Sequence, residues 1–130
     1  MNNVQVTPHF KLAKLWSPDT CEIFCDKLFW AHMDKLEKLR CNLDMVLVVN
    51  SGHRSIAHNE KVGGASRSMH LRFATDLSPR GSGKMKDRLD QLYKEAKLLG
   101  FSGIGKYNSF LHVDCRELVG RVPAEWDNRT

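Results

Sequence analysis

Two long stretches of the chain carry hydrophobic residues at intervals of three and four, the spacing of an amphipathic helix with one buried stripe. They span Thr20–Arg40 and Lys84–Leu99. Ser17-Pro18-Asp19 precedes the first as a start signal, and Gly100 follows the second as a stop signal. We therefore predict two helices, with buried stripes made of Ile23, Phe24, Leu28, Phe29, Met33, Leu36 and Leu39 in the first and Met85, Leu89, Leu92, Ala96 and Leu99 in the second.

Shorter hydrophobic runs predict the strands of a sheet. Met45–Val49 ends at a turn cluster, and Leu71–Leu77 is followed by a flexible loop at Ser78–Gly83. Gly103–Lys106 and Phe110–Cys115 are separated by a short turn, which predicts an antiparallel pair. We expect an α+β fold in which the helices pack on one face of a small antiparallel sheet.

Polar sequence between Ser51 and Ser68 predicts a long surface segment. It is rich in Gly, Ser, His and Arg, and it includes one helical turn near Ala57–Lys61. Near the N-terminus, Phe10–Trp16 has the pattern of a short amphipathic turn.

The composition is typical of one globular domain. The chain has 130 residues, of which 42% are hydrophobic and 27% charged, enough to bury a continuous core but too few residues for separate catalytic and targeting domains. Met1–Thr7 lacks the charged start and apolar region of a signal peptide, and no apolar run is long enough to span a membrane. We expect a single domain over residues 1–130, made in the cytoplasm without membrane insertion.

The net charge of +5 raises polyanions as partners, among them nucleic acid, anionic lipid and bacterial cell wall. Most basic residues on the predicted helices have acidic neighbours, as on a solvated helix face. The chain has no run of five like charges and no interleaved aromatic and basic motif, so we expect no specific nucleic-acid binding.

The four cysteines predict reduced thiols rather than a disulfide framework. Cys21 and Cys25 have helical spacing, but a four-cysteine zinc site needs a second close pair, and Cys41 and Cys115 are far apart in sequence. Core packing is the expected role.

Three polar residues that interrupt hydrophobic sequence suit a metal. His70, Asp76 and His112 supply two imidazoles and one carboxylate. This is a ligand set of catalytic zinc, which keeps its remaining position open for water. The pattern indicates a metal hydrolase.

Four motifs follow one another along the chain: Ser51-Gly52-His53-Arg54-Ser55, Val62-Gly63-Gly64-Ala65, Ser68-Met69-His70 leading to Ala74-Thr75-Asp76-Leu77, and Gly103-Ile104-Gly105-Lys106-Tyr107 with Phe110-Leu111-His112-Val113-Asp114. Together they resemble the zinc D-alanyl-D-alanine carboxypeptidase family. Its members include the vancomycin-resistance dipeptidases and the phage L-alanyl-D-glutamate endopeptidases, and the small phage-type branch is the most similar. The resemblance covers most of the chain and implies a metal site on one face of the sheet.

The resemblance implies that His70, Asp76 and His112 bind zinc and that Arg54 lies near the substrate carbonyl or carboxylate. Zinc with three protein ligands lowers the pKa of its bound water to about 7 and polarises an amide carbonyl. A guanidinium group can stabilise the oxyanion or bind a carboxylate. Asp114 follows His112 by two residues and shares its face of a strand, where it would orient that histidine or contact the bound water.

Other residues near the motifs are candidates for the cleft. Ser68 and His53 are candidates for substrate binding, although loop histidines are more often exposed or hydrogen-bonded to the backbone. Tyr107 and Trp126 would form a cleft wall or pack in the core.

Two positions depart from the family pattern. Asp76 follows His70 by six residues rather than seven, with Phe73 where a glycine is usual, so the connecting turn must be shorter. Ser109 lies three residues before His112, where many members carry a carboxylate that acts as general base.

The missing carboxylate leaves four alternatives. Asp114 serves as the base, which we favour; Glu60 or Glu117 reaches the site; zinc-bound hydroxide suffices at a reduced rate; or catalysis is lost and binding remains.

We expect a zinc peptidase that hydrolyses a peptide bond in the stem peptide of bacterial peptidoglycan, as a carboxypeptidase or an endopeptidase. Stem peptides carry free carboxylates, which suits a cationic protein. A monomeric phage or prophage lysis protein, an endolysin made in the host cytoplasm and released to the cell wall, fits these features. The competing hypothesis is a non-catalytic, zinc-containing module that binds the cell wall.

Overall fold

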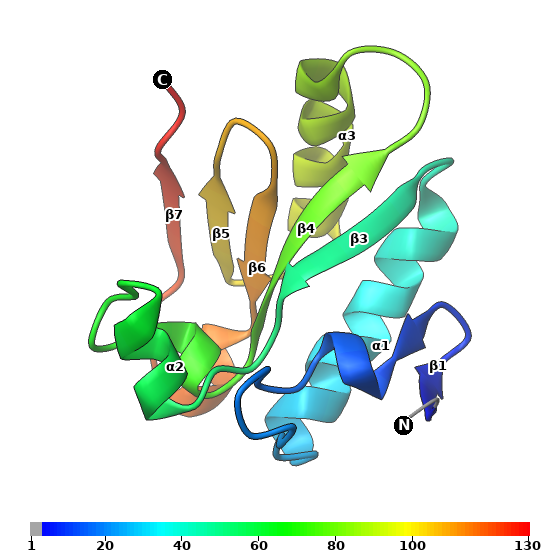
Figure 1. The fold of residues 1–130 in the computed structure, drawn as a ribbon. Helices are drawn as coiled ribbons and strands as arrows, with labels where there is room; N and C mark the ends of the chain where they lie inside the picture. The colour runs from blue at the N-terminus through cyan, green and yellow to red at the C-terminus, as the bar shows by residue number, and fades with distance from the viewer. Residues whose placement is uncertain (1–3) are drawn as a thin grey trace.

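The computed structural model describes residues 4–130 (Figure 1). The first three residues of the polar N-terminal segment considered above lie outside the described residues. In chain order the elements are β1 (Gln5–Thr7), β2 (Phe10–Lys11), the 3-10 helix η1 (Leu12–Lys14), α1 (Lys27–Asn42), β3 (Val46–Ser51), α2 (Ile56–Lys61), the 3-10 helix η2 (Met69–Leu71), β4 (Ala74–Arg80), α3 (Met85–Leu98), β5 (Gly103–Lys106), β6 (Leu111–Asp114), the 3-10 helix η3 (Arg116–Val119) and β7 (Ala124–Asp127).

A five-stranded sheet with strand order β3-β4-β6-β5-β7 forms the centre of the fold. The pairs β3–β4, β4–β6 and β6–β5 are antiparallel, whereas β7 lies parallel to β5. Strand β7 is not among the predicted strands, because its four residues alternate between half-buried and exposed and include only two hydrophobic side chains. The fold is α+β as expected, but its sheet is mixed rather than wholly antiparallel.

Alternation along β4 and β6 separates a packed face of the sheet from an open face. Leu77, Leu111 and Val113 are fully buried among the core residues. On the same side, His32 of α1 reaches Thr75 of β4, with 2.9 Å between Nε2 and Oγ1, and α3 contacts β4, β5 and β6. The intervening residues of the two strands therefore point to the opposite face, where the candidate ligands lie.

Helix α1 begins at Lys27 rather than at Thr20. The Asp26 carboxylate accepts a hydrogen bond from the Phe29 N–H at 3.0 Å, which caps the helix. Because the preceding residues are not helical, Phe24 is 71% exposed instead of lying on the buried stripe.

The residues predicted to start this helix hold a loop instead. Ser17 Oγ accepts a hydrogen bond from the Ser55 N–H at 2.9 Å, and Ser55 Oγ donates to Asp19 at 2.6 Å. Ser55 also caps α2, because its side chain accepts from the His58 N–H. The predicted start signal thus anchors the segment that leads into the candidate site.

Strand β4 is shifted along the chain relative to the predicted Leu71–Leu77. Ser68 Oγ accepts a hydrogen bond from the His70 N–H at 3.2 Å and starts η2, so the first predicted strand residues are helical. At the other end β4 pairs with β3 as far as Arg80, which makes part of the predicted loop at Ser78–Gly83 a strand. By contrast, α3, the turn at α2 and β5 lie within one residue of their predicted bounds.

All four cysteines are free, as predicted, but only Cys115 is buried. Cys21, Cys25 and Cys41 are exposed, so the prediction that they pack in the core is wrong for these three. The late start of α1 explains the first two, which precede the helix, and Cys41 lies on its exposed face.

Candidate metal centre

The register between two central strands brings two of the predicted ligands together. Asp76 on β4 is directly opposite His112 on β6, and His112 Nδ1 lies 3.0 Å from Asp76 Oδ1. His70, from η2, places its Nε2 3.2 Å from the same oxygen. The three ligand atoms lie within 4.8 Å of one another, and all three residues are buried. The structure therefore groups the residues that the motifs single out.

Both histidines are held through their second nitrogen. His70 Nδ1 lies 2.7 Å from the Gly52 carbonyl oxygen, and His112 Nε2 lies 2.7 Å from Asp114 Oδ2. A carbonyl and an ionised carboxylate only accept hydrogen bonds, so these two nitrogens carry the protons. In neutral rings, the nitrogens that face Asp76 are then lone pairs. Two lone pairs and a carboxylate oxygen aimed at one point repel one another unless a cation lies between them, so the donor set fits a divalent metal ion.

Burial disfavours the charged forms of Asp76 and His112, but polar contacts within the cluster favour those forms more strongly. Burial opposes ionisation of Asp76, but its contacts with His112 and His70 hold the pKa of its carboxyl well below the usual range. Burial likewise disfavours the charged form of His112, yet its hydrogen bonds to Asp114 and Asp76 raise its pKa above the usual value. The carboxylate is thus ionised, and protons compete with a metal for His112.

Asp114 is fully buried behind His112 and tied to Arg116. Arg116 donates to its two oxygens from Nε at 2.9 Å and from Nη2 at 2.8 Å. A Cβ on Gly103 would lie 2.2 Å from Asp114 Oδ1 and 2.4 Å from Arg116 Nε, so only glycine leaves room for this pair. With both oxygens engaged, Asp114 is suited to orient His112 and has no free oxygen directed at the cleft.

A cleft of about 530 Å³ opens over the three ligands. Its lining mixes cationic and aromatic side chains with short polar ones from the loops. Besides the ligands, the lining side chains include Arg54, Arg67, Ser68, Tyr107, Phe110, Arg116, Arg121 and Trp126.

Arg54 lies at the edge of the ligand cluster. Its Nη2 lies 3.8 Å from Asp76 Oδ2. Its Nε and Nη1 donate to Ser51 Oγ and Asn59 Oδ1, both at 3.2 Å. Two of the guanidinium nitrogens are thus fixed by the protein, and the third is directed toward the site.

A family model described as Peptidase M15 matches residues 8–114. The chain belongs to the peptidase M15 family. Membership makes it a metallopeptidase, and it indicates the metal dependence, usually on zinc, and the action on peptidoglycan that characterise M15 peptidases. No curated protein is a significant match to the chain.

Not every residue that the motifs single out reaches the cleft of this M15 peptidase. His53 is buried, its Nδ1 lies 3.1 Å from the Arg72 carbonyl oxygen, and it is not part of the cleft lining. Ser109 and the two alternative carboxylates, Glu60 and Glu117, are also outside the lining. Arg54 and Ser68 line the cleft, where their predicted contact with substrate stays a prediction.

Arg116, Arg121 and Asn59 also contribute to the site, although none of them belongs to a motif that predicts it. Arg116 follows Asp114 by two residues, and this short acid–arginine spacing next to the last ligand motif was the available signal. Arg121 reaches the cleft from the segment before β7 and donates to the Arg67 carbonyl at 2.9 Å, a contact with no local sequence signature. No helix in the described part of this M15 peptidase is both long and apolar enough to cross a membrane.

Proposed function

We propose that this M15 peptidase hydrolyses a peptide bond in the stem peptide of bacterial peptidoglycan, with zinc held by His70, Asp76 and His112. The observation that carries the proposal is the convergence of two imidazole nitrogens and one carboxylate oxygen at an open cleft. Zinc bound there would supply a Lewis acid for the amide carbonyl and a water molecule with a pKa of about 7.

The protein's own part in the reaction begins with the fixed rings. The Gly52 carbonyl and the Asp114 carboxylate each hold one imidazole in the tautomer that presents a lone pair to the site. Asp114 thus acts through His112, as a positioning residue. Its negative charge would also make the His112 ring a stronger metal ligand.

Arg54 is proposed to bind the substrate carbonyl or a carboxylate. At 3.8 Å its Nη2 is too far from Asp76 for a strong hydrogen bond, so this group is available to an acceptor on the substrate. Its contacts to Ser51 and Asn59 hold the guanidinium plane in place, which lowers the entropy lost when substrate binds.

Proton transfer in the cleft has few candidates. Among the described residues, Asp76 is the only carboxylate in the lining. Of the four alternatives for the missing base, this favours hydrolysis without a protein carboxylate as base, at a rate reduced by the roughly 10²–10⁴-fold that such a base contributes.

The proposed substrate is an anionic peptide. Arg67 and Arg121 line the cleft together with Arg54, and stem peptides present free carboxylates to such groups. Cleavage of a terminal bond would be carboxypeptidase action, and cleavage within the stem would be endopeptidase action. The masses of the released fragments distinguish the two.

A phage or prophage lysis protein is the proposed biological setting. The protein would be made in the host cytoplasm, act as a monomer, and reach the wall through a pore made by another protein. Its net charge of +5 would favour binding to the anionic wall.

The test is incubation of the zinc-loaded protein with isolated cell walls, followed by mass spectrometry of newly formed amino groups. We expect new amino termini with the wild type and none with His112→Ala. A metal-loaded wild type that binds walls but releases no product at any pH would overturn the peptidase proposal. That result would establish the non-catalytic wall-binding module, which the absence of a carboxylate at Ser109 otherwise favours.

A further inference from the structure

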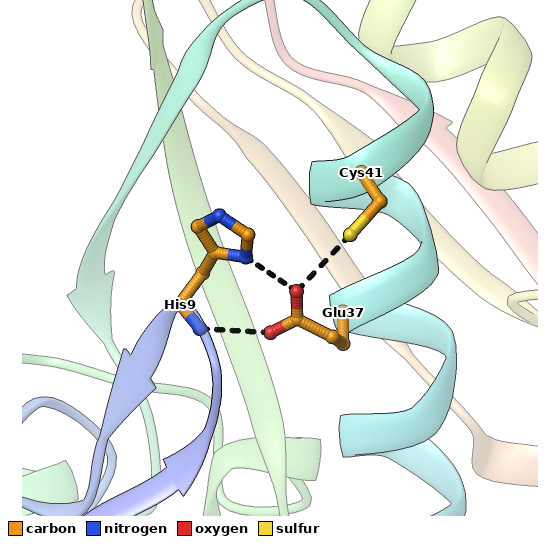
Figure 2. Close-up of side chains that lie close together, drawn as sticks. All are labelled: His9, Glu37 and Cys41. Carbon is orange, nitrogen blue, oxygen red and sulfur yellow. Dashed lines mark hydrogen bonds and ion pairs between the residues drawn. The ribbon is translucent and has the colours of Figure 1, made fainter.

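A second group of metal-ligand side chains lies where the N-terminal hairpin meets α1 (Figure 2). His9 occupies the turn between β1 and β2, while Glu37 and Cys41 are one helical turn apart on α1. His9 Nδ1 lies 2.5 Å from Glu37 Oε2, and Cys41 Sγ lies 3.2 Å from the same oxygen. Figure 2 shows the three side chains directed at one another, and none of them lines the catalytic cleft.

The donor types suit zinc. An imidazole nitrogen, a carboxylate oxygen and a thiolate sulfur are its usual protein ligands. With a neutral imidazole, Glu37 and a Cys41 thiolate carry two negative charges, which match a divalent cation. Because thiolate is a soft ligand, the set disfavours magnesium and calcium.

The spacing is close to what a tetrahedral ion needs. Bonds of about 2.0–2.3 Å place neighbouring ligand atoms about 3.5 Å apart. The ligand atoms of His9, Glu37 and Cys41 all lie within 4.8 Å of one another. The His9 side chain is 39% exposed and the Cys41 residue is exposed, so both can turn by the small amount required.

Hydrogen-bond contacts to the Glu37 carboxylate now link the three side chains. The hydrogen bond that the Cys41 thiol donates to Glu37 raises the pKa of the thiol. A metal with thiolate affinity can displace the thiol proton, as in other sites where binding releases protons.

We propose that His9, Glu37 and Cys41 form a second, structural zinc site that fastens the β1–β2 hairpin to α1. Bonds form from zinc to His9 Nδ1, a Glu37 oxygen and Cys41 Sγ. The Cys41 thiol proton leaves to solvent, and the neutral His9 ring carries its single proton on Nε2, so that the Nδ1 lone pair faces the metal. No electron transfer is involved.

Cobalt(II) provides the decisive test, because a cobalt–thiolate bond gives a charge-transfer band in the near ultraviolet and the catalytic ligands include no sulfur. The experiment uses the full chain carrying His70→Ala and His112→Ala, so that the result does not depend on the proposed function. We expect the band in this background and its loss on adding Cys41→Ser. Adding Cys25→Ser, at another exposed cysteine, should leave the band unchanged.

Thermal unfolding supplies a second readout. Zinc should raise the Tm of the His70→Ala, His112→Ala protein, and His9→Ala should abolish the rise. Circular dichroism establishes that each variant is folded. The proposal is overturned if folded protein gives no charge-transfer band, or if the band survives Cys41→Ser.

Discussion

The two proposed groups of metal ligands differ in how firmly the fold holds them. At His70, Asp76 and His112 the side chains are buried, and each imidazole is fixed through its far nitrogen by another group. At the hairpin, His9 and Cys41 lie at the surface and meet a single carboxylate. Burial and a fixed tautomer position a ligand before metal arrives, whereas the surface group must adjust when it binds. We therefore expect the cleft site to bind zinc more tightly than the hairpin site.

The largest effect should come from removing a buried ligand. In a Cys41→Ser background, which silences the hairpin site, His70→Ala or His112→Ala should abolish zinc binding at the cleft. Hydrolysis should fall by more than the roughly 100-fold typical of losing an outer partner of a ligand. Metal analysis of dialysed protein checks this, and full metal content in both variants would refute the assignment of the ligands.

Asp114→Asn should separate positioning from proton transfer. An amide in this place can stabilise the wrong tautomer of His112, so zinc affinity should fall about 10–100-fold. If Asp114 only positions the ring, saturating zinc restores much of kcat. A kcat that stays low at saturating zinc, with the basic limb of its pH profile changed, would instead support the role of general base.

Gly103→Ala tests how closely the outer partners are packed. The new Cβ would overlap the Asp114–Arg116 pair, and overpacking of this kind costs about 1–3 kcal/mol of the free energy of unfolding. Urea unfolding measures the cost, with Gly81→Ala as the control, because a Cβ there meets its nearest neighbour at 3.4 Å. Equal stability of the two variants would show that Asp114 and Arg116 move aside easily.

Acid should weaken the attachment of the hairpin through Glu37. Burial opposes ionisation of its carboxyl, but hydrogen bonds from neighbours including His9 and Cys41 lower its pKa from 4.5 to about 2. Because the folded-state pKa is depressed, this stabilisation is present above about pH 4.5 and is lost as the pH falls toward 2. Over that range, metal-free wild type should lose more unfolding free energy than Glu37→Gln. Equal losses of unfolding free energy in the wild type and in Glu37→Gln, measured by urea titration at each pH, would contradict this.

The smallest effect is expected at an exposed ion pair on the same helix. Lys38 Nζ lies 3.0 Å from Asp34 Oδ2, and both side chains are mostly exposed. Lys38→Ala should change the free energy of unfolding by at most about 0.5 kcal/mol. A larger change would mean that this exposed ion pair on α1 stabilises the protein more than exposed pairs usually do.

The grouping of His70, Asp76 and His112 could be predicted because each belongs to a short motif with its own chemistry. The unusual spacing of six residues between His70 and Asp76 is accommodated by η2 and by Phe73, which is buried in the core. The centroid of the Phe73 ring lies 5.0 Å from that of the Phe29 ring and 4.5 Å from that of the His32 ring. Phe73 therefore contributes to the packing of α1 at the position where the family resemblance predicts a glycine.

Other features depend on contacts that local sequence does not encode. The start signal before α1 is engaged by Ser55, which lies far away in sequence, so the helix begins later than its hydrophobic pattern suggests. Strand β7 forms because it has an edge, β5, with which to pair. Arg121 enters the cleft only through the path of the chain between η3 and β7.

The pairing of Asp76 with His112 across β4 and β6 also determines whether the proposed metal site can be assembled. A slip of one residue in that register would turn one of the two side chains toward the core, so that the proposed ligands would lie on opposite faces of the sheet. Capture of an ion by all three proposed ligands would therefore require the completed pairing of β4 with β6. Under the proposed function, hydrolytic capacity would arise only with that part of the sheet in place.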